Sequence, residues 1–282
     1  MQFRLINTGF NTPAMNMAID EALLTSKMPV LRFYRWKPAG LSLGYFQDIK
    51  DINVDFCKKN NIDIVRRITG GKTVLHDKEL TYSFIINESL MPKSIIGSYK
   101  VISKGILQAL KELGIDASMK EEINKNLSIE KNTNITNYKK NNSAVCFNEP
   151  SYYEIIANNK KIVGSAQTRK QGKLLQHGAV LIDIDIEKYV NCFNLENIKD
   201  EIEKSKNRIT SINNELFNKK NPITRNKIKK ITYDNVAKAM ESGFGKNFKV
   251  KLIKDELTDK ELILARKSER NKYSKNRWNF TR

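Results

Sequence analysis

The chain has 282 residues, with 50 Lys and Arg against 31 Asp and Glu, which gives a formal net charge of +19 at pH 7 and a pI near 9.7. Hydrophobic residues make up 40% of the sequence and aromatic residues 9%, which excludes an intrinsically disordered chain and predicts a globular protein with a sizeable core. The positive charge favours acidic partners, whether nucleic acid, an anionic membrane or an acidic protein, and does not by itself choose among them.

The cysteines and histidines argue against disulfides and metals. Cys57, Cys146 and Cys192 have no C-x-x-C spacing, so they indicate neither a disulfide framework nor a zinc site. With only His76 and His177 as histidines, we expect no bound metal. The N-terminus lacks the pattern of a signal peptide, and no apolar run approaches the roughly 18 residues of a membrane span. We therefore expect a soluble, cytoplasmic protein with no membrane partner.

The first half of the chain reads as strands with a few helices between them. Thr12 and Pro13 predict the start of a helix, because Thr caps and Pro suits the first turn. Further helices are expected at 54–60 and at 98–113, the latter ending at Gly114. Apolar, β-branched and aromatic runs predict strands at 3–7, 30–36, 41–45, 63–67, 73–76 and 80–86.

The second half begins with a Lys- and Asn-rich segment of little periodicity, which predicts a mobile insert at about 120–143. Strands predicted at 152–157 and 161–168 flank Asn158 and Asn159, a hairpin signal, and a third strand covers 174–182. Beyond 186 the pattern becomes helical, with helices at 232–244 and 258–272. Thr258 and Glu261 have the spacing of a capping box. This order predicts an α+β fold, with a mixed central β-sheet flanked by helices.

Two segments interrupt predicted strands with glycine. Gly70 and Gly71 allow a close approach of the backbone to a carbonyl or phosphate oxygen, with Arg67 beside them. A plain tight turn explains the glycines equally well, and His76 is as readily a hydrogen-bonded core histidine as a functional one. At 176–179, Q-H-G-A interrupts a strand in the way expected where a backbone approaches a ligand.

Cys146 and Lys161 form a further candidate group. Cys146 precedes F-N-E-P, an irregular turn from which a side chain can project into a cavity, whereas Cys57 and Cys192 lie in apolar patterns typical of buried cysteines. Lys161 begins an otherwise apolar strand. Because the thiolate is the nucleophilic form of cysteine and a nearby ammonium lowers its pKa, the two residues are candidates for covalent catalysis if the fold brings them together.

Four motifs occur along the chain: R-R-I-T-G-G-K-T-V-L-H-D-K-E-L-T-Y-S at 66–83, C-F-N-E-P-S-Y-Y-E-I at 146–155, K-I-V-G-S-A-Q-T-R at 161–169 and L-L-Q-H-G-A-V-L-I-D at 174–183. Together they resemble the lipoate–protein ligase A superfamily and, within it, the ligase-like octanoyltransferases of Gram-positive bacteria. The resemblance covers nearly the whole chain. It implies a biotin/lipoate-ligase-like catalytic domain, with one compact unit over 1–282, a catalytic core at about 28–245 and a C-terminal helical extension at about 246–282.

The resemblance also implies an activity. An octanoyl group moves from acyl carrier protein to a lysine of a lipoyl-carrying protein, typically the H protein of the glycine cleavage system, as the first step of lipoyl cofactor synthesis. Cys146 is then the acyl-thioester nucleophile, and Lys161 lowers its pKa and orients the acyl carbonyl. No cofactor is implied, because the donor is already a thioester. The residues implied to bind the acyl substrate are Arg67, Gly70, Gly71, His76, Gly164, Ser165, His177 and Gly178.

Two features depart from the family pattern. Lys72 and Thr73 stand where the family more often has Arg or Gly and then Ala, and the insert lengthens the approach to Cys146. Neither departure removes a catalytic group. The insert could nevertheless affect docking of the carrier proteins.

Three rival functions remain. An ATP-dependent lipoate–protein ligase shares the fold and the lysine but needs no cysteine, so Cys146 and the lack of a large accessory domain favour the transferase. An amidotransferase between H protein and other lipoyl domains also uses a cysteine; the E-L-T-Y-S run at 79–83 and the position of Cys146 favour the octanoyltransferase. A nucleic-acid-binding protein would need aromatic residues among its lysines for base stacking, and these are missing, so we expect no nucleic-acid partner.

Overall fold

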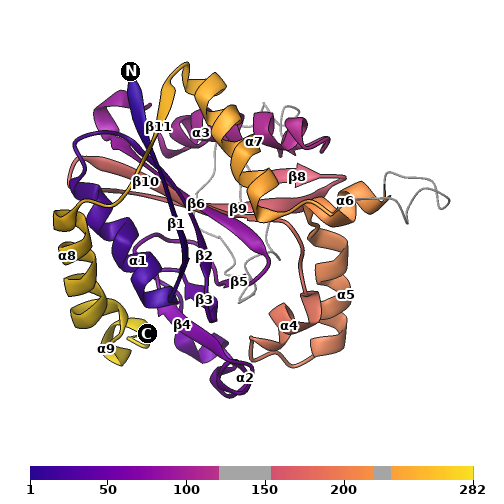
Figure 1. Cartoon of the computed structure of the whole chain (residues 1–282). Coiled ribbons are helices and arrows are strands. Elements are labelled where there is room, and N and C mark those ends of the chain that lie inside the picture. The colour runs from indigo at the N-terminus through magenta and orange to yellow at the C-terminus, as the bar shows by residue number, and fades with distance from the viewer. Residues whose placement is uncertain (121–153, 219–229, 282) are drawn as a thin grey trace, which may run out of the picture.

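The computed structural model describes residues 1–120, 154–218 and 230–281 (Figure 1). Cys146, nearly all of the insert predicted at about 120–143 and the first residues of the strand predicted at 152–157 lie outside the described residues.

The described strands form two sheets. The larger has the order β11-β1-β2-β6-β10-β9-β8-β7, and the smaller has the order β4-β3-β5. β11, β1 and β2 run parallel, and the remaining neighbours in the larger sheet are antiparallel. In the smaller sheet β3 is parallel to β4 and antiparallel to β5. The strands are β1 (Gln2–Asn11), β2 (Val30–Trp36), β3 (Ala39–Leu43), β4 (Ile62–Arg66), β5 (Val74–His76), β6 (Glu79–Asn87), β7 (Ser118–Met119), β8 (Ile155–Ala157), β9 (Lys160–Lys170), β10 (Lys173–Leu181) and β11 (Lys251–Asp255).

Helices cover both faces of the larger sheet, so the predicted α+β class with a mixed central sheet is confirmed (Figure 1). Hydroxyl side chains cap α1, α3 and α8 at Thr12, Ser94 and Thr258, each accepting a hydrogen bond from a backbone N–H of the first turn. The α-helices are α1 (Pro13–Ala22), α2 (Val54–Lys59), α3 (Ile95–Glu112), α4 (Ile186–Asn191), α5 (Ile198–Arg208), α6 (Ile212–Asn218), α7 (Tyr233–Phe248), α8 (Asp259–Ser268) and α9 (Asn276–Asn279), and a π-helical turn (Glu269–Tyr273) follows α8.

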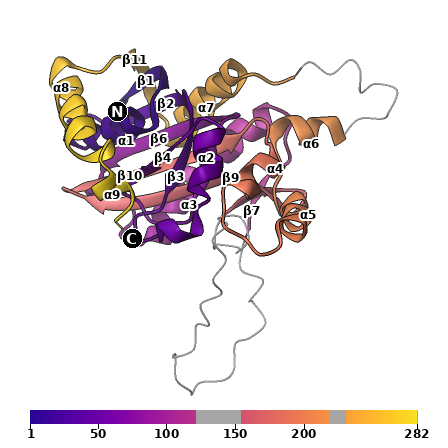
Figure 2. The same ribbon diagram turned by 90° about the horizontal axis from the view of Figure 1, so that it is seen from below.

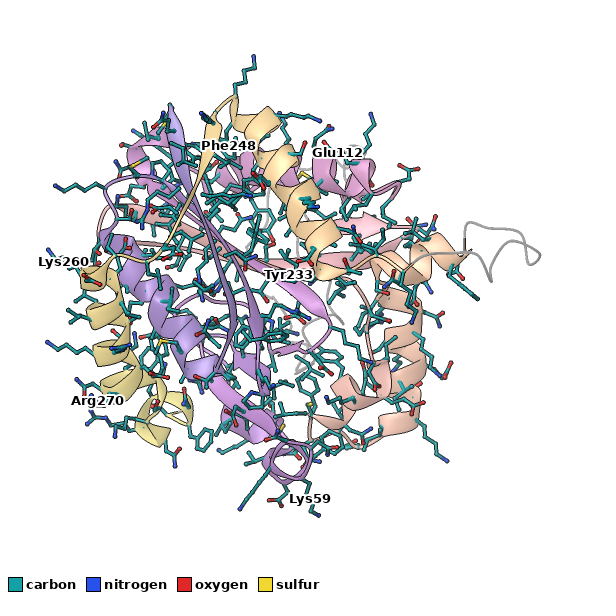
Figure 3. The ribbon with its side chains drawn as sticks, in the orientation of Figure 1. Lys59, Glu112, Tyr233, Phe248, Lys260 and Arg270 are labelled. Carbon is teal, nitrogen blue, oxygen red and sulfur yellow. The ribbon has the colours of Figure 1, made fainter. Side chains whose placement is uncertain are left out.

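One face of the larger sheet is covered by α3 and α7, which cross it side by side (Figure 1). Tyr233 and Phe248 mark the two ends of α7 in Figure 3. Phe84 of β6 packs against Phe244 and Phe248 with ring centroids 5.5 and 5.0 Å away. Leu31 and Phe33 of β2 belong to the same buried cluster, which is the largest apolar core among the described residues.

The opposite face meets α1, α8 and the smaller sheet. Figure 2 shows α1 and α8 together on this side, with β3 and β4 next to them. Residues that alternate with the first core along β2, among them Val30, Tyr34 and Trp36, point to this side and form a second buried cluster with α1. A third cluster joins the smaller sheet to α2, α4 and α5 and contains Cys57 and Cys192. Both cysteines are fully buried, which confirms that prediction.

Most predicted elements lie within a few residues of the observed ones, and β2 has the predicted bounds. α3 begins at Ile95 rather than 98, because Ser94 supplies its cap. The C-terminal segment predicted as helical also contains a strand, β11, between the end of α7 and α8. No described helix is long and apolar enough to cross a membrane.

Candidate functional site

A cavity of about 180 Å³ lies between the larger sheet and the smaller sheet. Since roughly 10–15 Å³ of such space holds one water molecule, there is room for on the order of a dozen water-sized groups. The cavity is concave and mostly apolar, with a few polar side chains, which is typical of small-molecule sites. It is lined by Met17, Tyr34, Trp36, Ser42, Arg67, Gly71, Lys72, Val74, His76, Thr81, Lys161, Gly164, Ser165, Ala166, His177, Gly178 and Ala179.

The floor of the cavity is a row of residues in register across four strands of the larger sheet. Tyr34 of β2 pairs with Thr81 of β6, which pairs with Ala179 of β10, which pairs with Gly164 of β9. Paired residues point to the same face, so this row decreases in side-chain size from β2 to β9. The space above the sheet is therefore narrow beside Tyr34 and wide beside Gly164, on the strand that also carries Lys161.

The neighbouring row of the same face contains three buried polar residues, Arg32 of β2, Ser83 of β6 and His177 of β10. His177 lies with Nδ1 3.0 Å from Asp20 Oδ2 and Nε2 2.7 Å from Thr69 Oγ1. Burial lowers the pKa of His177 below its usual value, although Asp20 opposes this. The neutral ring therefore donates from Nδ1 to the carboxylate and accepts the Thr69 hydroxyl proton at Nε2. Both ring nitrogens are thus occupied by protein groups.

Asp20 of α1 packs against this row and forms a hydrogen bond with each of its three polar residues. Its carboxylate accepts from the Arg32 guanidinium at 2.6 Å, from Ser83 at 2.8 Å and from the Tyr34 hydroxyl at 2.9 Å. Burial alone would raise the pKa of Asp20, but Arg32 and His177 outweigh it, so the pKa lies below its usual range. Asp20 therefore remains a carboxylate that fixes the orientation of His177.

His76, on the smaller sheet, has a similar arrangement. Its Nδ1 lies 2.8 Å from Glu79 Oε1 and its Nε2 lies 2.8 Å from Ser42 Oγ. The ring stacks on Trp36, with centroids 4.0 Å apart and planes at 10°. A carboxylate, a histidine and a hydroxyl group thus occur in series on each side of the cavity.

Arg67 joins the two series. Its guanidinium donates at 3.2 Å to Thr69 Oγ1 and at 3.2 Å to Ser42 Oγ. It also donates to the carbonyls of Gly70 at 2.8 Å and Lys72 at 2.7 Å. A continuous hydrogen-bonded chain of side chains therefore runs beside the cavity through Asp20, His177, Thr69, Arg67, Ser42, His76 and Glu79. Arg67 holds the 69–72 loop in shape.

Glycine is required at two close backbone approaches, one between Gly44 and the 69–72 loop and one between β10 and β9. A Cβ at Gly44 would lie 1.7 Å from the Gly71 carbonyl oxygen, and a Cβ at Gly178 would lie 2.5 Å from the Gly164 carbonyl oxygen. Gly71 itself has φ +85°, a conformation that L-residues rarely adopt. A Cβ at Gly70, by contrast, would meet nothing within 4 Å.

Lys161 lies on β9 and lines the wide part of the cavity. Its Nζ donates to Glu154 Oε1 at 2.6 Å, and both side chains are buried. Nearby, Ser165 Oγ lies 2.8 Å from the Tyr82 hydroxyl, which also accepts from Gln176. Burial raises the pKa of Tyr82 to about 12, so it remains a neutral phenol.

The candidates predicted from the sequence gather at this cavity. The lining includes Arg67, Gly71, His76, Lys161, Gly164, Ser165, His177 and Gly178. Gly70 lies in the adjacent loop, with its carbonyl turned to Arg67. Cys146 lies outside the described residues. No group of three or more His, Cys, Asp or Glu side chains in the described ranges could hold a metal ion.

Several residues of the site were not predicted from the sequence. Asp20 and Glu79 hold the two histidines, and Glu154 holds Lys161. Asp20 was the most detectable, because it interrupts the apolar run M-A-I of the first helix. Glu154 lies within a quoted motif, but nothing local distinguishes it from an exposed acid. Lys72, which departs from the family pattern, also lines the cavity.

Comparisons with known proteins agree with the geometry. The family model "Lipoyl protein ligase A/B catalytic domain" matches residues 12–245. The protein "Octanoyltransferase LipM" of Lysinibacillus sphaericus is 41% identical over 283 residues, which cover 98% of this chain and 97% of the relative. The protein of the same name from Bacillus subtilis is 40% identical over 292 residues, covering 99% of this chain and 98% of the relative. Full-length likeness to transferases confirms the predicted enzyme class.

A solved structure is also similar. The crystal structure of lipoate-protein ligase A bound with ATP superimposes with a TM-score of 0.76 at 26% sequence identity, covering 99% of each chain. This agrees with the resemblance found in the four motifs.

Proposed function

Because the chain belongs to the lipoyl protein ligase A/B catalytic-domain family, we propose that it transfers an octanoyl group from acyl carrier protein to a lysine of a lipoyl-carrying protein, such as the glycine cleavage H protein. The observation that carries this proposal is the cavity between the two sheets, with its apolar end at Tyr34 and Met17 and Lys161 at its wide end. The transfer would be a step in the synthesis of protein-bound lipoyl groups.

The shape of the floor supports one orientation of the acyl chain. The tail would lie along the row from Gly164 to Tyr34, with its methyl end in the narrow part beside Tyr34 and its carbonyl beside Lys161. About seven buried methylene and methyl groups at ~0.8 kcal/mol each would contribute roughly 5–6 kcal/mol of binding free energy. Both histidines have their ring nitrogens occupied by protein groups, so they would form walls of the chain's binding site rather than act as acids or bases.

Cys146 is the proposed nucleophile. Its thiolate would attack the thioester carbonyl of the phosphopantetheine arm, the carbon–sulfur bond of the donor would break, and the pantetheine thiol would leave with a proton. This exchange of one thioester for another is close to isoergic. The lysine of the acceptor protein would then attack the enzyme thioester and form an amide, a downhill step that needs no ATP.

Lys161 would stabilise this chemistry in two ways. An ammonium near a thiol lowers the pKa of that thiol, and an ammonium near a carbonyl stabilises negative charge on its oxygen. We therefore expect Lys161→Ala to move alkylation of Cys146 to higher pH. An unchanged alkylation profile would leave Lys161 a residue that only positions substrate.

Further oxyanion donors are proposed in the 69–72 loop. The pairing of β10 with β6 and β9 engages the N–H groups of His177 and Gly178 in the sheet. In the loop, the carbonyls of Thr69, Gly70 and Lys72 accept hydrogen bonds from Tyr45 and Arg67. Because N–H and C=O of a trans peptide point in opposite directions, the loop N–H groups of the same peptides point away from those partners. This supports the loop, rather than β10, as the donor site.

The charge of the chain supports the proposed partners. Acyl carrier proteins and lipoyl domains are generally acidic, and a net charge of +19 would steer them towards the enzyme.

Mass spectrometry after incubation with octanoyl-acyl carrier protein tests the proposal. An octanoyl adduct released by hydroxylamine is expected on Cys146 and is expected to be missing in Cys146→Ala. Undiminished acyl transfer by Cys146→Ala would overturn the thioester mechanism. Comparing octanoyl-acyl carrier protein with octanoyl-H protein as donor separates this reaction from an amidotransferase.

An ATP-dependent lipoate ligase is the second candidate, favoured by the similarity to the solved ligase bound with ATP. That reaction would proceed through an acyl adenylate. Release of pyrophosphate from ATP that depends on lipoate or octanoate would establish it in place of the transferase.

A further inference from the structure

The C-terminal helix α9 lies beside the end of β4 (Figure 1), beyond residues 12–245 that the family model matches. Asn279 of α9 is buried, and its side chain makes two hydrogen bonds. Its Oδ1 accepts from the backbone N–H of Arg66 at 2.9 Å, and its Nδ2 donates to the Tyr273 carbonyl at 2.8 Å. The amide of Asn279 thus satisfies the last backbone N–H of β4, the edge strand of the smaller sheet.

Arg66 is bound to α9 through its backbone and its side chain. The Trp278 indole N–H donates to the Arg66 carbonyl at 2.8 Å. The Arg66 guanidinium donates at 3.2 Å to the carbonyl of Trp278 and at 3.0 Å to that of Asn279. Arg66 is 2% exposed, and its guanidinium is a rigid, planar group of donors. The position of α9 therefore fixes the position of this guanidinium.

The same guanidinium holds the 44–47 loop. It donates to the carbonyl oxygens of Gly44 at 2.9 Å, Tyr45 at 3.3 Å and Gln47 at 2.6 Å. The Trp278 ring also lies near Tyr45, with ring centroids 5.8 Å apart. Arg66 therefore joins α9 to this loop.

The 44–47 loop in turn packs against the loop that carries Gly71, a residue of the cavity lining. The Tyr45 N–H donates to the Thr69 carbonyl at 2.9 Å. A Cβ at Gly44 would lie 1.7 Å from the Gly71 carbonyl oxygen, so the two backbones are in direct contact. A displacement of one loop therefore displaces the other.

We propose that α9 is a positioning element of the acyl-transfer site and that Asn279 is its positioning residue. By fixing Arg66, Asn279 holds the 69–72 loop where the loop N–H groups would meet the oxyanion of the reacting thioester. Asn279 does not line the cavity, so it acts through Arg66 and the two loops. This inference rests on the proposed function, because it assigns α9 a part in that reaction.

The first test separates kcat from KM for octanoyl transfer by Asn279→Ala. Loss of an interaction made only in the transition state lowers kcat and leaves KM unchanged. We expect kcat to fall on the order of 10-fold, because displaced oxyanion donors slow the reaction, with KM for octanoyl-acyl carrier protein within about twofold. Trp278→Phe removes one hydrogen bond to Arg66 but keeps a ring beside Tyr45, and should lower kcat by about two- to fivefold.

Two control variants separate positioning from stability. Asn276 begins the same helix and is exposed, so Asn276→Ala makes the same chemical change away from Arg66 and should leave kcat within about twofold of the wild type. Ile106→Ala weakens the large apolar core on the other face of the sheet and should leave kcat per folded molecule unaltered. Circular dichroism gives the folded fraction of each variant.

Hydrogen exchange supplies a second readout that needs no substrate. Amides exchange faster where local opening costs less free energy. In Asn279→Ala we expect faster exchange in the peptide that covers 66–76 than in the wild type or Asn276→Ala. Exchange in β6, which belongs to the larger sheet, should be the same in all three proteins.

The outcomes distinguish this inference from the proposed function. A kcat for Asn279→Ala within twofold of that for Asn276→Ala, beside an active wild type, would overturn the role of α9 and leave the proposed function standing. A raised KM with an unchanged kcat would also overturn it, because α9 would then act on binding. Unchanged exchange at 66–76 would overturn the link between α9 and the loop, whichever reaction the cavity serves. If the wild type transfers no octanoyl group, the proposed function fails, and the exchange measurement alone decides the link.

Discussion

The two faces of the larger sheet are made by alternate residues of the same strands, yet they differ in chemistry. Towards α3 and α7, β2 and β6 present Leu31, Phe33 and Phe84 to an apolar core. Towards the cavity the same strands present Arg32 and Ser83, which join the buried network around Asp20. Burying these polar side chains is favourable only if every donor and acceptor has a hydrogen-bond partner. The apolar face, in contrast, is stabilised by the apolar surface area that it removes from water.

One face of the sheet therefore stabilises the fold, and the other carries the functional site. Apolar packing on the α3 and α7 side holds the strands, and this leaves the opposite side able to carry a cavity and a network of charges. We therefore expect substitutions on the first face to change the free energy of unfolding, and substitutions on the second to change acyl transfer.

The largest expected effect is on the apolar face. Ile106 of α3 is fully buried in the large core, and Ile106→Ala should lower the free energy of unfolding by about 2–5 kcal/mol, from lost transfer free energy and a cavity. Urea unfolding measures the change. Octanoyl transfer by the folded fraction should be unaltered, and a loss of activity larger than the unfolded fraction would break the comparison.

The next effect is on the cavity face. Gly44→Ala would place a Cβ against the Gly71 carbonyl and displace the 69–72 loop, so kcat/KM for octanoyl transfer should fall on the order of 100-fold. Gly245→Ala on α7 is the matched control, because its Cβ would lie 3.6 Å from the Val250 carbonyl oxygen, an ordinary contact outside the cavity, and should leave the rate within about twofold of the wild type. Equal rates for the two variants would show that the 69–72 loop has no role in octanoyl transfer.

A pH measurement sharpens the comparison further. The pKa of His177 is lowered by folding, so the unfolded chain binds more protons below about pH 6.5. The contribution of His177 to the free energy of unfolding is present above this pH. It is lost as the pH falls towards the lowered pKa of the folded state, by up to about 1.4 kcal/mol per pH unit. His177→Asn should flatten this slope in urea unfolding. The corresponding loss at Asp20 begins only below about pH 4, so a slope unchanged in His177→Asn between pH 6.5 and 5 would contradict the buried neutral histidine.

The smallest effect concerns the surface rather than either face. Raising the salt from about 50 to 200 mM should weaken octanoyl transfer by a few fold through KM for the carrier protein, because screening reduces electrostatic association. The value of kcat should change less. A KM independent of salt would exclude steering by the net charge.

Much of the fold could be predicted from local signals. The strand Val30–Trp36, the Thr12 cap with Pro13, and the Thr258–Glu261 capping box are all observed. β11 was missed because its five residues are rich in lysine, and its partner is β1 at the other end of the chain. A strand at a sheet edge owes its pairing to that partner more than to its own sequence.

Some site residues could be predicted because a glycine or a polar residue interrupts a strand pattern. Glycines and polar breaks in strands pointed to Gly71, His177 and Gly178, which line the cavity. Asp20 and Glu154 could not be assigned, because an isolated acid is ordinarily solvated and only its contacts give it a role. Asp20 meets His177 across 157 positions of sequence. Such pairings depend on the three-dimensional arrangement of α1 and β10.

The central claim is that the cavity serves an ATP-independent transfer of an octanoyl group. The most direct measurement combines the purified full chain, octanoyl-acyl carrier protein and unmodified H protein without ATP, and follows the intact mass of H protein. We expect octanoylation of one lysine of H protein, unaffected by added ATP and abolished by Cys146→Ala. Modification that requires free octanoate or lipoate with ATP, and none from octanoyl-acyl carrier protein, would contradict it.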